Sequence, residues 1–162
     1  MKKLNICLIL LTALLMCSLV GCCLPSSDMP FNGEVDFHEL HVTIPESYIR
    51  DSTQSHKDLW TFEQNGYDKV IILSRQDLSG DANTLLDGYV EVMLERQATS
   101  QRTTFCHQDA VHSTYTKDDV YCQEMLFVYN GSIYAIALRG GTEEDFFELL
   151  SSASLAELPA EM

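Results

Sequence analysis

A hairpin motif near the C-terminal end constrains the fold more than any other part of this chain. Two mostly apolar runs, Val120–Tyr129 and Ser132–Arg139, flank the dipeptide Asn130-Gly131. Asn-Gly favours the positive φ angles of a type I′ turn, so the runs are predicted to pair as antiparallel strands. The turn sets the predicted register: Phe127 with Tyr134, Leu126 with Ala135, Met125 with Ile136 and Val128 with Ile133. Both faces would then be apolar, so we expect helices to cover this sheet on both sides.

The rest of the chain supplies further strands and two helices. Residues 38–44 alternate polar and apolar side chains and end at Pro45, and Asn65-Gly66 marks a second hairpin. Apolar residues recur at helical spacing from Leu85 to about Gln97. Further elements are short strands at 103–106 and 111–116, a turn at Lys117-Asp118, and a second helix capped by Thr142 with Asp145.

The predicted fold class is α+β, an antiparallel β-sheet with helices on both faces. One domain is expected over residues 34–155, followed by a frayed tail at 156–162. This order of elements resembles the PsbP-like sandwich proteins, which include DcrB-type bacterial lipoproteins. The residues that carry the resemblance are Val42-Thr43-Ile44-Pro45, the helix from Leu85 to Leu94, the run from Phe127 to Ile136, and Glu144-Asp145-Phe146. The resemblance implies a PsbP-like α/β/α sandwich with a non-enzymatic accessory or binding role, and it supplies no catalytic residue.

The first 21 residues have the pattern of a secretory signal peptide. Lys2 and Lys3 precede an apolar run of 17 residues, Leu4–Val20. A membrane-spanning helix needs about 20 apolar residues, so length alone leaves that alternative open. The next residues favour a signal peptide, because Leu19-Val20-Gly21-Cys22 resembles the lipobox of bacterial lipoproteins.

The lipobox resemblance implies cleavage before Cys22 and a diacylglyceryl group on its thiol. The chain would then be lipid-anchored on the extracytoplasmic face of a bacterial membrane. Residues 22–33 carry Pro25, Pro30, Ser26 and Ser27 and show no periodicity, so they are predicted to form a flexible tether.

The net charge of the chain limits the kinds of partner that it can bind. The formal net charge is −14, and the leader contains Lys2 and Lys3 but no acidic residue. The exported part therefore carries 8 basic against 24 acidic residues, a net charge of −16. Such a polyanion repels nucleic acids and anionic lipid surfaces. We expect a membrane contact through the N-terminal lipid, a protein partner in the envelope, and no nucleic-acid partner.

Cys106 and Cys122 are candidates for a disulfide, because the exported compartment permits one. A turn at Lys117-Asp118 would place Cys122 opposite Ser113, about 23 Å along the strand from Cys106. A disulfide needs Cα atoms within about 7 Å. Only a chain reversal near residues 107–109 would bring the two cysteines together, so the bridge stays open as an alternative.

No motif predicts a catalytic residue, a metal site or a cofactor. His38-Glu39-Leu40-His41 lacks the four-residue histidine spacing of a helical zinc motif, and on a strand the two histidines would point to opposite faces. The chain has no Gly-x-Ser-x-Gly elbow and no phosphate-binding loop with its lysine. We therefore expect a binding module. The alternative is an envelope hydrolase or metal-dependent enzyme, which predicts a cleft with convergent carboxylates or histidines. A third alternative, a small-ligand receptor, predicts an apolar cavity.

Overall fold

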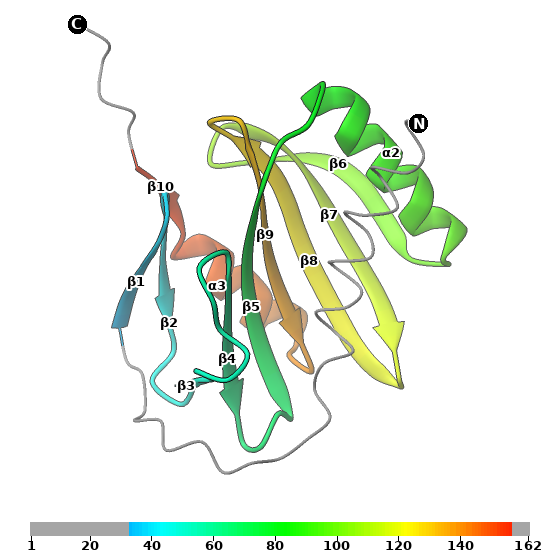
Figure 1. Cartoon of the computed structure of the whole chain (residues 1–162). Coiled ribbons are helices and arrows are strands. Elements are labelled where there is room, and N and C mark those ends of the chain that lie inside the picture. Colours follow the sequence, from blue (N-terminus) through cyan, green and yellow to red (C-terminus); the bar gives the residue numbers. More distant parts are fainter. Residues whose placement is uncertain (1–32, 157–162) are drawn as a thin grey trace, which may run out of the picture.

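The computed structural model describes residues 33–156 (Figure 1). The predicted signal peptide, the predicted lipidation site at Cys22, nearly all of the predicted tether and nearly all of the predicted C-terminal tail lie outside the described residues. The described elements in chain order are β1 (Gly33–Phe37), β2 (Leu40–Ile44), β3 (Ile49–Arg50), β4 (Leu59–Gln64), β5 (Lys69–Asp77), α2 (Ala82–Glu95), β6 (Thr99–Phe105), β7 (Gln108–Lys117), β8 (Val120–Tyr129), β9 (Ser132–Arg139), α3 (Glu143–Ser151) and β10 (Ser154–Leu155).

The strands of residues 33–156 form two sheets, and every strand pair within them is antiparallel. The larger sheet has the order β3-β4-β5-β9-β8-β7-β6, and the smaller has the order β1-β2-β10. Helix α2 packs on one face of the larger sheet, while α3 and the smaller sheet pack on the other (Figure 1). The predicted fold class, an α+β antiparallel sheet covered on both faces, is confirmed.

The central hairpin has the register predicted from its turn. Phe127 pairs with Tyr134 and Leu126 pairs with Ala135. Asn130 and Gly131 have φ angles of 48° and 69°, as a type I′ turn requires. The alternation of side chains sends Phe127 and Tyr134 into the core beneath α3, whereas Leu126 and Ala135 pack beneath α2. One hairpin therefore contributes to the hydrophobic core on each face of the larger sheet.

Both helices of the described residues begin at polar caps. The Asp81 carboxylate accepts a hydrogen bond from the Thr84 backbone N–H at 2.8 Å, ahead of α2. Thr142 and Asp145 form a reciprocal capping box at the start of α3, with distances of 2.8 and 3.1 Å. The predicted start of α3 is confirmed, and the same Asp145 also contributes to the pocket described below.

Three local predictions differ from the structure. The predicted strand 38–44 begins two residues later, at Leu40, because His38 and Glu39 form the turn between β1 and β2. The β4–β5 loop has four residues rather than two, so Gln64 pairs with Lys69. The β7–β8 turn lies at Asp118-Asp119 rather than Lys117-Asp118. The latter two differences shift the pairing by two residues, which keeps each side chain on its predicted face.

Cys106 and Cys122 are not disulfide-bonded in this structure, so the candidate bridge is not formed. Cys122 lies opposite Tyr115 rather than Ser113, while Cys106 lies in the turn beyond the Phe105–Gln108 pair. Seven residues of β7, about 23 Å, separate these two positions. The tight β6–β7 turn keeps Cys106 at the far end of the strand from Cys122.

His112 on β7 makes the stability of the α3 face sensitive to pH. Its ring stacks on Phe146 of α3 with centroids 5.6 Å apart, and its buried Nε2 has no hydrogen-bond partner in the described structure. Burial lowers the pKa of His112, although Glu143 opposes the shift. The unfolded chain therefore binds this proton more readily, so stability is greatest above the ordinary histidine pKa of about 6.5 and falls as the pH drops below it.

The free energy of unfolding should fall less between pH 7.5 and pH 5.5 in His112→Phe than in the wild type. The variant keeps an aromatic ring but removes the titration, which contributes at most about 1.4 kcal/mol per pH unit. Urea unfolding at several pH values measures the slope. His41→Gln is the matched control with the opposite sign, because the Asp36 hydrogen bond raises the pKa of His41. Equal slopes in wild type and His112→Phe would contradict the assignment.

Candidate functional site

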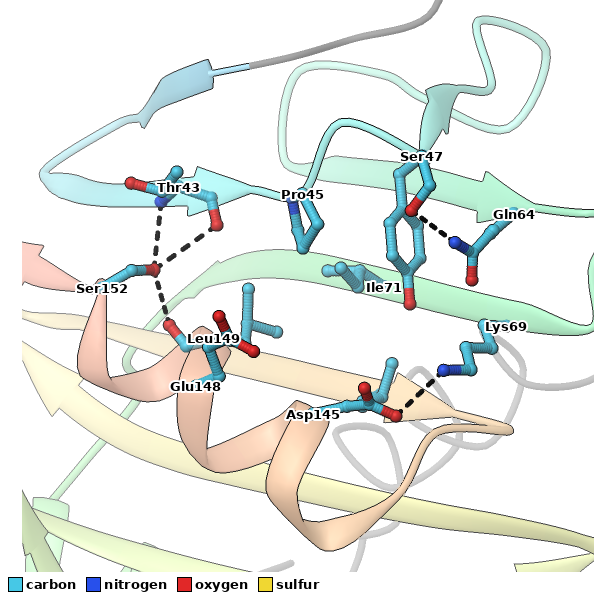
Figure 2. A pocket seen from close by; sticks show the side chains of 12 residues that line it. Thr43, Pro45, Ser47, Gln64, Lys69, Ile71, Asp145, Glu148, Leu149 and Ser152 are labelled. Atoms are coloured by element: carbon cyan, nitrogen blue, oxygen red, sulfur yellow. Dashed lines mark hydrogen bonds and ion pairs between the residues drawn. The ribbon is translucent and has the colours of Figure 1, made fainter.

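A pocket of about 270 Å³ lies between α3 and the strands β2, β4 and β5 (Figure 2). Three buried apolar residues, Ile71, Leu138 and Leu149, form its floor. Ile71 and Leu138 are direct cross-strand partners on β5 and β9, so the sheet itself forms the base of the pocket. An apolar floor with polar groups around the rim is typical of small-molecule sites.

The polar rim is held by an ion pair between α3 and the larger sheet. Lys69 Nζ lies 3.0 Å from Asp145 Oδ2, and both side chains are about one-third exposed, at 34% and 37% (Figure 2). Asp145 also accepts a hydrogen bond from the Thr142 backbone N–H. The Thr142 N–H and the Lys69 ammonium lower the pKa of Asp145. This carboxylate therefore stays ionised at neutral pH and fixes the position of the lysine.

The hydroxyl groups of the pocket are bonded to amides and carbonyls. Gln64 Nε2 donates to Ser47 Oγ. Ser152 Oγ accepts from the Thr43 N–H at 3.2 Å and donates to the Leu149 carbonyl at 2.7 Å. Within residues 33–156, neither serine is hydrogen-bonded to a carboxylate or a histidine that could act as its general base. The two serines of the pocket are therefore not arranged as nucleophiles.

Tyr48 adds a neutral aromatic wall to the pocket. Its side chain is buried, and burial together with the nearby Asp145 raises the pKa of Tyr48 to about 12. The phenol therefore keeps its proton at neutral pH. The charged groups among the residues that line the pocket are then Lys69, Asp145 and Glu148.

The two histidines of the His38-Glu39-Leu40-His41 motif do not lie together in one metal site. His38 lies in the β1–β2 turn, with Nε2 3.0 Å from the Lys57 carbonyl oxygen and 3.1 Å from Asp58 Oδ1. His41 lies on β2 and pairs with Asp36 at 2.7 Å. In the part of the chain that the structure describes, no group of three His, Cys, Asp or Glu side chains is arranged to hold a metal ion. The same part contains no helix long and apolar enough to cross a membrane.

Sequence reasoning missed the pocket. Lys69 and Asp145 are 76 residues apart, and they meet only because β5 lies next to β9, which leads directly into α3. The capping box did mark Asp145 as a fixed carboxylate at a helix start. Nothing in the sequence assigned Lys69 as its partner.

Comparisons with known proteins give a fold and no family. No family model matches the sequence, and no curated protein matches it. The solution structure of cyanobacterial PsbP (CyanoP) from Synechocystis sp. PCC 6803 is similar over 83% of this chain and 98% of its own, with a TM-score of 0.54 and 12% sequence identity. The fold is PsbP-like. The resemblance predicted from the sequence is therefore confirmed at the level of architecture.

Two further solved structures are similar to this chain. A protein from Bacteroides thetaiotaomicron VPI-5482 has a TM-score of 0.50 and 10% identity over 78% of this chain, which spans 50% of that protein. LpqN, involved in cell envelope biogenesis of Mycobacterium tuberculosis, has a TM-score of 0.35 and 14% identity over 82% of this chain and 87% of its own. At 12% identity the likeness to CyanoP shows the fold alone, and no function is transferred from any of these proteins.

Proposed function

We propose that this chain is a non-enzymatic binding module, held by lipid on Cys22 at the extracytoplasmic face of a bacterial membrane. The lipobox at residues 19–22 supports the anchor. The pocket beneath α3 supports binding, because it combines an apolar floor with a fixed polar rim. The partner is proposed to be another component of the cell envelope.

The position of the pocket is the observation that carries this proposal. Gly33, where the described structure begins, pairs directly with Ile44 of β2. Thr43 and Pro45, the two neighbours of Ile44, both line the pocket. Cys22 precedes Gly33 by eleven residues, which span at most about 40 Å when fully extended. An anchor at Cys22 would therefore keep the pocket near the membrane, where envelope components are concentrated.

The chemistry of the pocket favours binding over turnover. A hydrolase needs a nucleophile or water within hydrogen-bond reach of a general base. Here Ser47 and Ser152 are bonded to amide and carbonyl groups, and Asp145 is occupied by a lysine and a helix cap. These observations support a binding module rather than the alternative of an envelope hydrolase.

The proposal is tested in cells with a photo-crosslinking amino acid in place of Ser47, an exposed residue at the pocket rim. We expect the anchored protein to sediment with membranes and to form one recurrent adduct, identified by mass spectrometry. The same amino acid at Thr99, which is exposed on β6 away from the pocket, should not form that adduct. Identical adducts from both positions, or none from residue 47, would contradict a binding role for the pocket.

Cys22→Ser in the same experiment tests the anchor. The serine variant cannot form the thioether, so we expect it to leave the membrane fraction or to keep its leader uncut. Cys23→Ser is the matched control and should remain anchored and processed. A processed Cys22→Ser chain that still partitions with membranes would show that the anchor lies elsewhere.

A further inference from the structure

The charge of the pocket beneath α3 selects the kind of ligand that fits it. Lys69 is the single cation among the lining residues, and Asp145 already neutralises it at 3.0 Å. Glu148 lies one turn further along α3 and presents a second, exposed carboxylate to the same cavity (Figure 2). The lining thus carries one positive and two negative charges. An anionic ligand would compete with Asp145 for Lys69 and would face Glu148 as well.

Acidic residues around the pocket add to the negative charge of its lining. The first turn of α3 contains Glu143 and Glu144 beside Asp145, and Glu46 lies between the lining residues Pro45 and Ser47. The exported part of the chain carries 8 basic against 24 acidic residues. A cation approaching the pocket is therefore attracted over a long range as well as at contact.

The floor of the pocket excludes a bare ion as the natural occupant. Ile71, Leu138 and Leu149 are each at most 3% exposed, so their surfaces favour a hydrocarbon group. A metal ion would need several oxygen ligands at once, and no such group of side chains is present among residues 33–156. The space of about 270 Å³ accommodates a short chain or a small ring.

We propose that this pocket binds a primary ammonium group carried on a short apolar chain, with the ammonium at Glu148 and the chain on the Ile71–Leu138–Leu149 floor. The proposal rests on the binding role proposed above and names its ligand chemistry. The polar rim supplies acceptors for the ammonium N–H groups, including the Glu148 carboxylate and the Gln64 amide oxygen. Two sources present this chemistry, a free alkylamine and a lysine side chain of an envelope protein.

The test is calorimetric titration of the full-length protein in detergent with three ligands of the same length: hexylamine, 1-hexanol and hexanoate. We expect hexylamine to bind most tightly, 1-hexanol more weakly and hexanoate most weakly. Added salt should weaken the binding of hexylamine but not of 1-hexanol. Amide chemical shifts that move on hexylamine binding should cluster around Ile71 and Leu149. Equal affinity for hexylamine and 1-hexanol, or tighter binding of hexanoate, would overturn the proposal.

Glu148→Gln should weaken hexylamine binding about fivefold, the effect of one exposed ion pair, while leaving 1-hexanol binding unchanged. Glu144→Gln is the matched control, because it removes an exposed carboxylate from the same helix outside the pocket lining. Equal effects of the two substitutions would overturn the assignment of Glu148.

A peptide, acetyl-Gly-Lys-Gly-amide, distinguishes the two sources of the ammonium. Binding at least as tight as that of hexylamine indicates a lysine side chain, and markedly weaker binding indicates a free amine. Failure of every amine would remove the ligand assignment while leaving the binding role to be judged by the crosslinking at residue 47.

Discussion

Replacing Gly140 with alanine is expected to lower the free energy of unfolding by more than about 3 kcal/mol. Gly140 has a φ of +76°, and a Cβ added there would lie 2.0 Å from the backbone oxygen of Asp68. A backbone oxygen cannot rotate away as a side chain can, so the β4–β5 loop must move. Urea unfolding followed by Trp60 fluorescence measures the loss. Because Asp68 precedes Lys69, the same movement should weaken the Lys69–Asp145 ion pair and the binding of any ligand in the pocket.

Gly131→Ala is the matched control for this substitution. Gly131 has a similar φ of +69°, but an added Cβ would meet nothing within 4 Å. The control therefore measures the cost of the left-handed conformation alone, about 1–2 kcal/mol. If the two variants lose the same stability, the close approach of Gly140 to the β4–β5 loop is wrong.

Phe146→Ala should cost about 3–5 kcal/mol, the range for a large aromatic side chain removed from a packed core. Phe146 is fully buried, belongs to the core between the two sheets, and stacks on His112. Its loss should loosen α3, which carries Asp145, Glu148 and Leu149 of the pocket. Denaturant unfolding gives the free energy, and titration with hexylamine reports whether the pocket survives.

Phe147→Ala is the matched control for Phe146→Ala. It separates the loss of core packing from the change in helical propensity that both substitutions cause. Phe147 is the next residue on the same helix but is 47% exposed. We expect its replacement to change stability by less than about 1 kcal/mol. A loss as large as that of Phe146→Ala would mean that Phe147 is covered in solution by something other than the residues described here.

The sequence contained enough information for the centre of the fold. The Asn130-Gly131 turn determined both the register and the two-sided burial of β8 and β9, because a type I′ turn permits one pairing. Elsewhere the predicted pairing differed by two residues, at the loop after Gln64 and at Asp118-Asp119. Alternation determines which face a side chain occupies, and an even shift leaves that face unchanged. The exact partners depend on loop conformation, which pattern alone does not fix.

Strand β1 and the pocket could not be predicted for a different reason. Gly33–Phe37 is held by its pairing with β2, and the preceding residues have the composition of a linker. The pocket combines residues from β2, β4, β5, β9 and α3, and each of them has an ordinary local explanation. Lys69 begins a strand and Asp145 caps a helix. Lys69 and Asp145 form an ion pair only in the folded chain, so neither residue by itself could predict the pocket.

The pairing of β1 has a mechanical consequence. β1 is an edge strand joined to β2 by the tight turn at His38-Glu39, and Gly33 lies at the open end of that hairpin. A force applied at residue 33 would load the Gly33–Ile44 pair first and open the hydrogen bonds in succession, rather than shear them together. The force would therefore be transmitted first to Thr43 and Pro45, the neighbours of Ile44, which form one wall of the pocket. Tension on the N-terminal segment would thus act on the wall of the pocket before it acts on the core.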